Sequence, residues 1–259
     1  RLSTFKKRYI MARQKGIIKL EGTLDGLNFY NRLGEPLSRI AGGGFNSVAI
    51  KTKSSMSRVR ENGSEFKTCM TSVKYFKLGL QPISYQFKDT LLHQRLVQLF
   101  TRIKVFDSVS ERGQRTVGIG LQSAAGKKLL HRYVLTSGDG LDSVLRQGFE
   151  ADWQLNGFRI AAFDMAAVRF PKGATHVSLQ AGYLVFDFTT FTPVLAKSAP
   201  VVLSKATATA PLELGVSALP VGAGTKVMVV YLQFMQEVNG FMYPMKELNT
   251  RVFEVVYVD

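Results

Sequence analysis

One cysteine and three histidines are the side chains of this 259-residue sequence best suited to nucleophilic or acid–base chemistry. A catalytic thiol at Cys69 would need an accessible, electropositive pocket and a nearby base such as His93. Cys69 falls beside the apolar stripe of an expected helix, which favours a small buried side chain instead. His131 and His176 lack the neighbouring ligands of a metal site, and a lone cysteine excludes an internal disulfide or a cysteine-built zinc centre.

The glycine-rich segment from Gly118 to Lys128 matches a phosphate-binding loop only in part. Five residues, where the motif has four, separate Gly120 from Gly126. Lys128 stands where Ser or Thr would bind the magnesium ion. We therefore expect a hairpin turn with solvated lysines at this place.

Two pairs of acids are spaced closely enough to act together. Glu61 and Glu65 are four residues apart on an expected helix and are flanked by arginines, a pattern typical of a salt-bridged surface. Asp139 and Asp142 share a glycine-rich turn that would suit a weak calcium ion, but they lack the EF-hand spacing. The sequence thus predicts no catalytic residue, cofactor or metal, and we expect a protein that is not an enzyme.

Positive charge is concentrated in the first half of the chain. Lys plus Arg number 34 against 19 Asp plus Glu, a net charge of +15, and residues 1–135 hold 25 basic and 8 acidic residues. An arm of this kind suits salt-dependent binding to the phosphates of nucleic acid or to another polyanion. Alternatively, the basic half contacts the mildly acidic half of a neighbouring copy, or only keeps the protein soluble. The candidate polyanion-binding residues are Lys6, Lys7, Arg8, Arg13, Lys15 and Lys19.

The N-terminal part carries hairpin signals. Ile17–Thr23 is expected to be a strand and Leu27–Tyr30 its return strand, because Asp25-Gly26 favours a type I′ turn. Gly42-Gly43-Gly44 predicts a flexible break or a close approach of the backbone, and Phe45–Lys53 a short strand or an extended linker.

Apolar residues spaced three and four apart then predict two helices. The first is expected to begin after Gly63 and to end at Gly79 and Pro82. Such a helical hairpin would leave its apolar stripes exposed, so it must pack on a sheet or on another copy. The two stripes are Phe66, Met70, Val73, Phe76 and Leu80, and Phe87, Leu91, Leu92, Leu96, Phe100 and Ile103.

From Thr116 onward the pattern predicts strands separated by turns such as Asn239-Gly240, as in an antiparallel β-sandwich. Val227–Leu232 is apolar on both faces and predicts a central strand. Phe170–Val177 and Leu219–Val227 resemble each other and are expected to enter two equivalent edges of the sandwich, unless the likeness is chance. The expected strands are Val117–Leu121, Phe158–Ala162, Val177–Phe188, Val201–Leu203, Leu212–Val216, Thr225–Glu237 and Val252–Val258.

These patterns predict an α+β protein. Its expected parts are a basic N-terminal arm (1–15), a β-hairpin with a Gly-rich linker (16–55), a helical hairpin (56–108) and a C-terminal antiparallel β-sandwich (109–259). No apolar run reaches the roughly 18 residues of a membrane span. The basic N-terminus lacks the apolar run of a cleavable signal peptide, which predicts synthesis in the cytoplasm, with a place in a released particle left open.

Six motifs lie along most of the chain, namely Met11–Ile17, Gly22–Tyr30, Arg60–Phe66, Ser110–Arg115, Pro171–His176 and Gln236–Gly240. They are similar to motifs of a family of uncharacterised proteins common in Bacteroidetes genomes. The resemblance begins at Met11, implies a bacterial or phage-related origin, and places residues 1–10 outside the family's usual start. The family offers no assigned activity or catalytic residue to transfer, and Gly42–Lys53 departs from its usual continuation.

The sequence therefore favours a non-enzymatic structural subunit that assembles with copies of itself, as in a tube, a sheath or a particle shell. The alternative is a nucleic-acid-binding protein that uses the basic arm on phosphates. A third hypothesis is a β-sandwich module that binds carbohydrate or protein through an exposed row of aromatic side chains.

Overall fold

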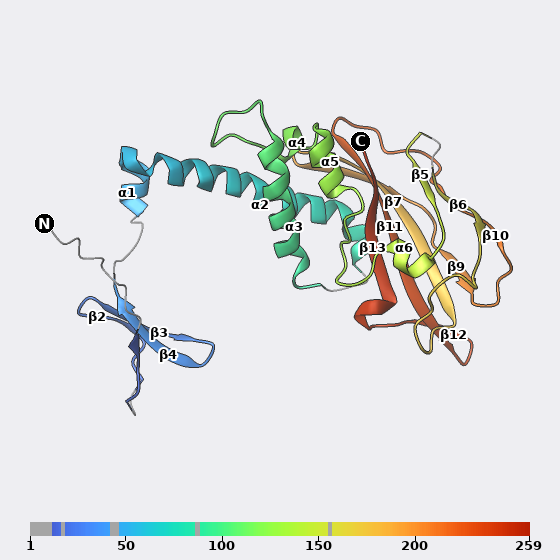
Figure 1. Cartoon of the computed structure of the whole chain (residues 1–259), viewed down its shortest axis with the longest axis horizontal. Helices are drawn as coiled ribbons and strands as arrows, with labels where there is room; N and C mark the ends of the chain where they lie inside the picture. Colours follow the sequence, from blue (N-terminus) through green and yellow to red (C-terminus); the bar gives the residue numbers. More distant parts are fainter. Residues whose placement is uncertain (1–11, 17–18, 42–46, 86–88, 155–156) are drawn as a thin grey trace, which may run out of the picture. The chain divides into compact units, whose positions relative to one another are not determined.

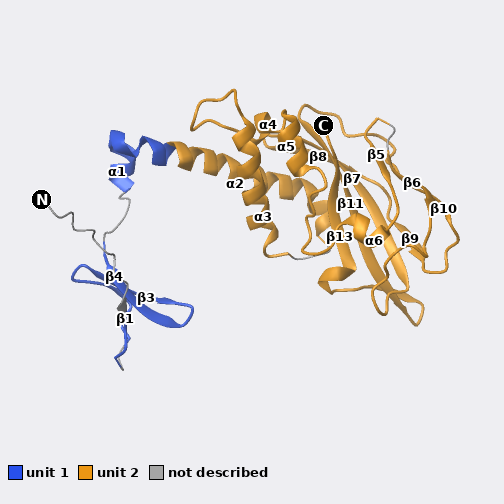
Figure 2. Ribbon diagram, viewed as in Figure 1, with its two compact units in different colours: residues 1–60 blue, residues 61–259 orange. Residues whose placement is uncertain are grey.

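The computed structural model describes residues 12–16, 19–41, 47–85, 89–154 and 157–259. The chain is an α+β protein with a C-terminal antiparallel β-sandwich, as predicted (Figure 1). It divides into two compact units, an N-terminal unit (residues 1–60) and a C-terminal unit (residues 61–259) (Figure 2). The predictions for Lys6, Lys7, Arg8 and Gly42–Gly44 lie outside the described residues.

The N-terminal unit contains a four-stranded antiparallel sheet in the order β1-β4-β3-β2. The predicted Asp25-Gly26 turn is confirmed, since both residues have positive φ angles of 44° and 76°. Leu33 and Gly34 form a second turn of this kind, with φ angles of 54° and 85°. The strands are β1 (Ala12–Arg13), β2 (Gly22–Leu24), β3 (Leu27–Arg32) and β4 (Glu35–Ile40).

Two expectations for the N-terminal unit are wrong. Lys19–Glu21 is not strand, so β2 is shorter than predicted, while Ile17 and Ile18 lie outside the described residues. The segment expected as a strand or linker forms helix α1 (Ser47–Thr52), followed by a 3₁₀ turn, η1 (Ser54–Met56). Arg60 stabilises this helix end, because its guanidinium donates to the carbonyls of Ile50 (2.6 Å) and Lys53 (2.9 Å).

Helix α2 (Ser57–Ser84) is longer than the sequence predicts at both ends. Gly63 lies inside it, and Pro82 falls only two residues before its end, where a missing N–H interrupts little of the helix. Gly79 does not stop the helix either. A Cβ atom there would lie 2.5 Å from the Cβ of Pro193, so glycine allows the helix to approach the sheet closely.

Helix α3 (Leu92–Ile103) continues into a 3₁₀ turn, η2 (Lys104–Phe106). Its start is set by Asp89, whose Oδ1 accepts from the backbone N–H groups of Leu91 (2.8 Å) and Leu92 (3.0 Å). The predicted stripes of α2 and α3 meet in part, and the ring of Phe76 packs edge-on against that of Phe100 with centroids 5.4 Å apart. The inclusion of Phe66 and Leu91 in these stripes is wrong, since they are exposed by 50% and 54%. Phe87, at the expected start, lies outside the described residues.

The predicted strand at Val117–Leu121 and the predicted hairpin turn after it are wrong. Both segments are short helices, α4 (Val117–Gly120) and α5 (Ala124–Leu130), and α6 (Leu141–Leu145) follows. Gly120 and Gly126 allow the backbones of α3, α4 and α5 to pack closely. A Cβ at Gly120 would lie 2.3 Å from the carbonyl oxygen of Ile103, and one at Gly126 would lie 2.0 Å from the carbonyl oxygen of Gly120.

The β-sandwich consists of a six-stranded and a three-stranded antiparallel sheet. In the larger sheet β7 (His176–Asp187) pairs with β11 (Thr225–Val238) at the centre. Strand β7 also pairs with β8 (Thr192–Lys197) and β9 (Val201–Ser204). Strand β11 also pairs with β12 (Phe241–Pro244) and β13 (Arg251–Val258), and the 3₁₀ turn η3 (Leu248–Thr250) comes just before β13. The smaller sheet contains β10 (Ala210–Leu214), β6 (Gly157–Phe163) and β5 (Glu150–Asp152).

The larger sheet is buried on both faces, which confirms the central-strand prediction for Val227–Leu232. Helices α2–α5 cover one face over a core that includes Phe186 and Val229. The smaller sheet covers the other over a core that includes Tyr183 and Met228 (Figure 1). The two similar segments lead into β7 and β11, which pair with each other, so the expectation of two sandwich edges is wrong.

Candidate functional site

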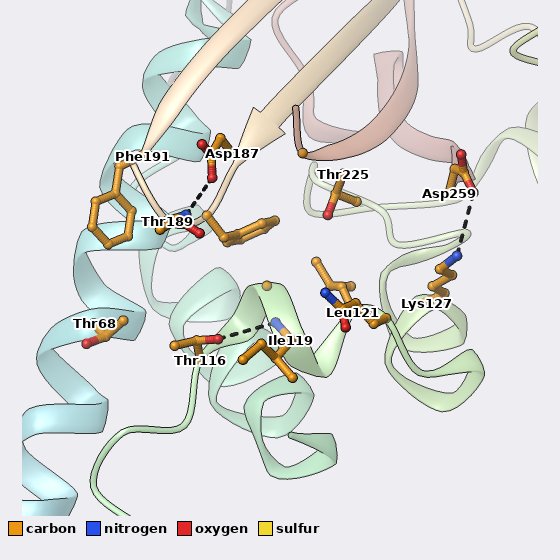
Figure 3. A pocket seen from close by; sticks show the side chains of 14 residues that line it. Thr68, Thr116, Ile119, Leu121, Lys127, Asp187, Thr189, Phe191, Thr225 and Asp259 are labelled. Atoms are coloured by element: carbon orange, nitrogen blue, oxygen red, sulfur yellow. Dashed lines mark hydrogen bonds and ion pairs between the residues drawn. The ribbon is translucent and has the colours of Figure 1, made fainter. Parts of the chain in front are cut away.

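A pocket of about 700 Å³ lies in the C-terminal unit between helices α4 and α5 and the end of the larger sheet (Figure 3). Its walls mix hydroxyl groups with apolar side chains. Thr68 of α2, Thr116 before α4 and Thr225 of β11 line it together with the aromatic residues Phe188 and Phe191. Such a lining suits a small, largely uncharged ligand rather than an ion.

The charged side chains that line this pocket have hydrogen-bond or ion-pair partners within the protein. The Asp187 carboxylate accepts from the backbone N–H of Thr189 (2.7 Å) and the hydroxyl of Thr190 (2.8 Å), and these bonds lower its pKa. Lys127 Nζ lies 3.6 Å from Asp259 Oδ1 (Figure 3). The described lining residues include neither cysteine nor histidine, so the pocket offers hydroxyl groups but no thiol–imidazole pair.

Cys69, His131 and His176 occupy structural positions. Cys69 is 0% exposed in the core under α2, and burial raises the pKa of its thiol, which confirms the buried side chain predicted. His131 Nε2 lies 3.2 Å from the carbonyl oxygen of Val256, and His176 Nδ1 lies 2.9 Å from the hydroxyl of Thr175. Within the described ranges, no group of three or more His, Cys, Asp or Glu could hold a metal ion.

The paired acids of α2 lie in a different environment from the one expected. Glu65 is buried, pairs with Lys104 and accepts from the backbone N–H of Gly113 (2.8 Å), so it is not part of a solvated surface. Burial raises its pKa, but the bonds from Lys104 and Gly113 outweigh burial and lower it. Glu61 Oε2 pairs with Arg112 Nε at 3.1 Å. Both acids therefore fix the segment before α4 against helix α2.

The segment before α4 is also held together by one buried carboxylate, that of Asp107. Asp107 accepts three backbone N–H groups, from Val109 (3.1 Å), Ser110 (2.8 Å) and Thr116 (2.9 Å). Burial raises the pKa of Asp107, yet these bonds outweigh it and hold the pKa below its ordinary value. Asp107 thus orients Thr116, whose hydroxyl in turn accepts from the first turn of α4 at the pocket wall.

The acids expected as a weak calcium site are tied to arginines instead. Asp139 pairs with Arg169, and Asp142 pairs with Arg132. Arg132 also lies 3.0 Å from Glu254, a buried carboxylate on β13 that accepts from the backbone N–H of Leu141 at 2.6 Å. Burial raises the pKa of Glu254 despite these two partners. The glycine-rich turn is therefore held to the sheet by ion pairs.

Three of the six residues predicted to bind a polyanion belong to the described part of the chain. Arg13 pairs with Glu35 at 3.4 Å, and Lys19 Nζ donates to the carbonyls of Gln14 (2.8 Å) and Gly16 (2.7 Å). Both side chains therefore have local partners while remaining on the surface. The N-terminal unit holds 13 basic and 3 acidic residues, a net charge of +10.

The N-terminal sheet also carries an apolar surface that the sequence did not single out. Of the described residues in this unit, only Leu37 is buried. Leu24, Leu27 and Ile40 are exposed, the last two by 42% and 64%. The alternation of apolar and polar residues from Leu27 onward is the signal that could have revealed this surface.

A second apolar surface lies on the β11–β12 hairpin of the C-terminal unit. Val238 and Phe241 pair across the hairpin and share one face with Tyr243 on the next position of that face, and all three are exposed. Asn239 and Gly240, with φ angles of 51° and 80°, make the tight turn between them, as predicted. Each unit thus exposes apolar side chains at a sheet.

Comparisons of the chain with protein-family models, with curated proteins and with solved structures find no match. None of the helices in the described ranges combines the length and the apolar character needed to cross a membrane.

Proposed function

We propose that this protein is a structural subunit that assembles with copies of itself and does not act as an enzyme. The supporting observation is the N-terminal sheet. Four short strands bury one side chain, Leu37, among the described residues, whereas a small sheet needs a covered apolar face to be stable in water. Contact with another copy supplies that cover.

The exposed hairpin of the C-terminal unit supports the same proposal. Contiguous apolar patches are rare on monomeric proteins and mark interaction surfaces. A subunit with one such surface in each unit can contact two neighbours, as repeated assembly requires. A tube, a sheath or a particle shell of bacterial or phage-related origin is the kind of assembly we propose, in line with the resemblance to the Bacteroidetes family.

Electron microscopy of the purified chain tests this proposal. We expect ordered particles or tubes whose abundance rises with protein concentration. A field of single 28.7-kDa particles at every concentration would contradict it.

Binding to a polyanion is the second candidate, and the net charge of +10 on the N-terminal unit favours it. Lys6, Lys7, Arg8, Arg13, Lys15 and Lys19 are the residues proposed to neutralise phosphates. The two candidates are compatible, because an assembled shell or tube can enclose a polyanion.

A further inference from the structure

The two faces of the N-terminal sheet differ in chemistry, and strand register defines them. Residues directly opposite each other on paired strands point to the same face. Leu27 pairs with both Leu24 and Ile40, so these three side chains share one face, and Phe29 follows two positions after Leu27. We call this the apolar face, formed by Leu24, Leu27, Phe29 and Ile40, with Asn31, Pro36 and Ser38 beside them.

The opposite face carries the charge. Asn28 lies opposite Arg39, and Arg32 lies opposite Glu35, so these side chains point away from the apolar face. Arg13 lies opposite Leu37 and joins them. None of the strand residues that we assign to the apolar face is charged, whereas the charged face holds three arginines and one glutamate.

We propose that the apolar face of the N-terminal sheet packs face to face on the same face of a second copy of this chain. The inference rests on the proposed self-assembly and names the contact. An unlike partner attracted by the +10 charge of this unit would meet the charged face. Self-packing of the uncharged face brings no like charges together and turns the arginines outward.

The size of the face sets the strength of the contact. Strands β3 and β4 have six residues each, whereas β1 and β2 have two and three, so two facing sheets of this size bury roughly 500–600 Å². That is less than the roughly 1,200 Å² of a stable isolated interface. The contact is therefore weak by itself and gains strength when several contacts act together in an assembly.

Two neighbouring residues of β3 provide a matched test. Leu27→Asp and Asn28→Asp add the same charge on opposite faces of one strand of the full-length chain. In sedimentation velocity we expect Leu27→Asp to raise the protein concentration needed for assembly at least ~10-fold, and Asn28→Asp to change it less than ~2-fold. If the wild type assembles and both variants assemble equally well, the face-to-face contact is wrong while self-assembly stands. If the wild type is a monomer at every concentration, the face-to-face contact and the proposed self-assembly are both wrong.

Cross-linking keeps the test decisive if Leu27→Asp does not fold. Ile40→Cys on the apolar face and Arg39→Cys on the charged face are adjacent exposed positions, and the native Cys69 is fully buried. With a bismaleimide that spans the ~10 Å between packed sheets, we expect at least ~5-fold more covalent dimer from Ile40→Cys. An Ile40→Cys thiol that stays accessible in the assembly would overturn the proposed contact. A thiol that is protected but does not link to the Ile40→Cys thiol of a second copy would also overturn it, and would show that another surface covers this face.

Discussion

Leu27 and Ile40 lie directly opposite each other on strands β3 and β4, and both side chains remain exposed. A cross-strand apolar pair normally stabilises a sheet by lying under another layer. In the C-terminal unit such pairs are covered, as Val227 and Leu184 of β11 and β7 are by helix α2. The exposed pair in the N-terminal unit is the reason why we propose an assembling role for this protein.

The close approach of helix α2 to the larger sheet depends on Gly79. We expect Gly79→Ala to lower the unfolding free energy by about 1–3 kcal/mol, because its Cβ would collide with the rigid ring of Pro193. The melting temperature measured by calorimetry should fall by about 2–10 °C.

Gly63 of the same helix is the matched control. A Cβ there has no neighbour within 4 Å, so Gly63→Ala should raise stability by about 1 kcal/mol through helix propensity alone. Equal melting temperatures for the two variants would show that α2 does not pack on the sheet as described.

The loop before α4 should be sensitive to acid because of Asp107. Its pKa is lower in the folded chain than the ordinary value of about 3.9. Its stabilising contribution is therefore complete above that ordinary value and is lost as pH falls through the folded-state pKa. Urea unfolding should show Asp107→Asn less stable than the wild type by about 2 kcal/mol at pH 7.

The difference in unfolding free energy between Asp107→Asn and the wild type should begin to narrow below about pH 4, where the carboxylate of the unfolded chain becomes protonated. It should narrow further as pH falls through the lowered folded-state pKa. Asp25→Asn changes an exposed turn carboxylate and serves as the control, with little effect at either pH. A constant difference for Asp107→Asn between pH 7 and pH 3 would contradict the role given to this charge.

Polyanion binding by the arm predicts a specific salt dependence. Fluorescence anisotropy with a short DNA duplex should give an affinity that falls steeply between 50 and 200 mM salt, the range over which ~6–10 phosphate contacts lose most of their strength. Lys6→Ala with Lys7→Ala should reduce the slope of log K against log salt by about 2. The exposed pair Lys172→Ala with Lys246→Ala should leave the slope unchanged. Equal slopes for both double variants would exclude the arm from binding.

Much of the C-terminal unit was predictable because its patterns are long. Val227–Leu232 is apolar on both faces, and the structure buries this strand between helices and a second sheet. Asn239-Gly240 fixes a turn through the φ angles that these residues tolerate. In such segments local preference and tertiary packing agree.

The short helices and the buried charges were not predictable, since they depend on distant residues. Gly118-Ile119-Gly120 alternates like a strand, but close packing of Gly120 on the carbonyl of Ile103 accompanies a helix. Glu65 has the sequence neighbours of a surface residue, while its partner Lys104 comes 39 positions later. The apolar face was missed because β4, which supplies Ile40, was not predicted.

The mass of the full-length chain, measured by size-exclusion chromatography with light scattering over a 100-fold range of concentration, tests the central claim most directly. The account predicts a mass that rises above 28.7 kDa as concentration increases, to a multiple of the single chain. A mass that stays at 28.7 kDa up to the highest concentration would contradict it.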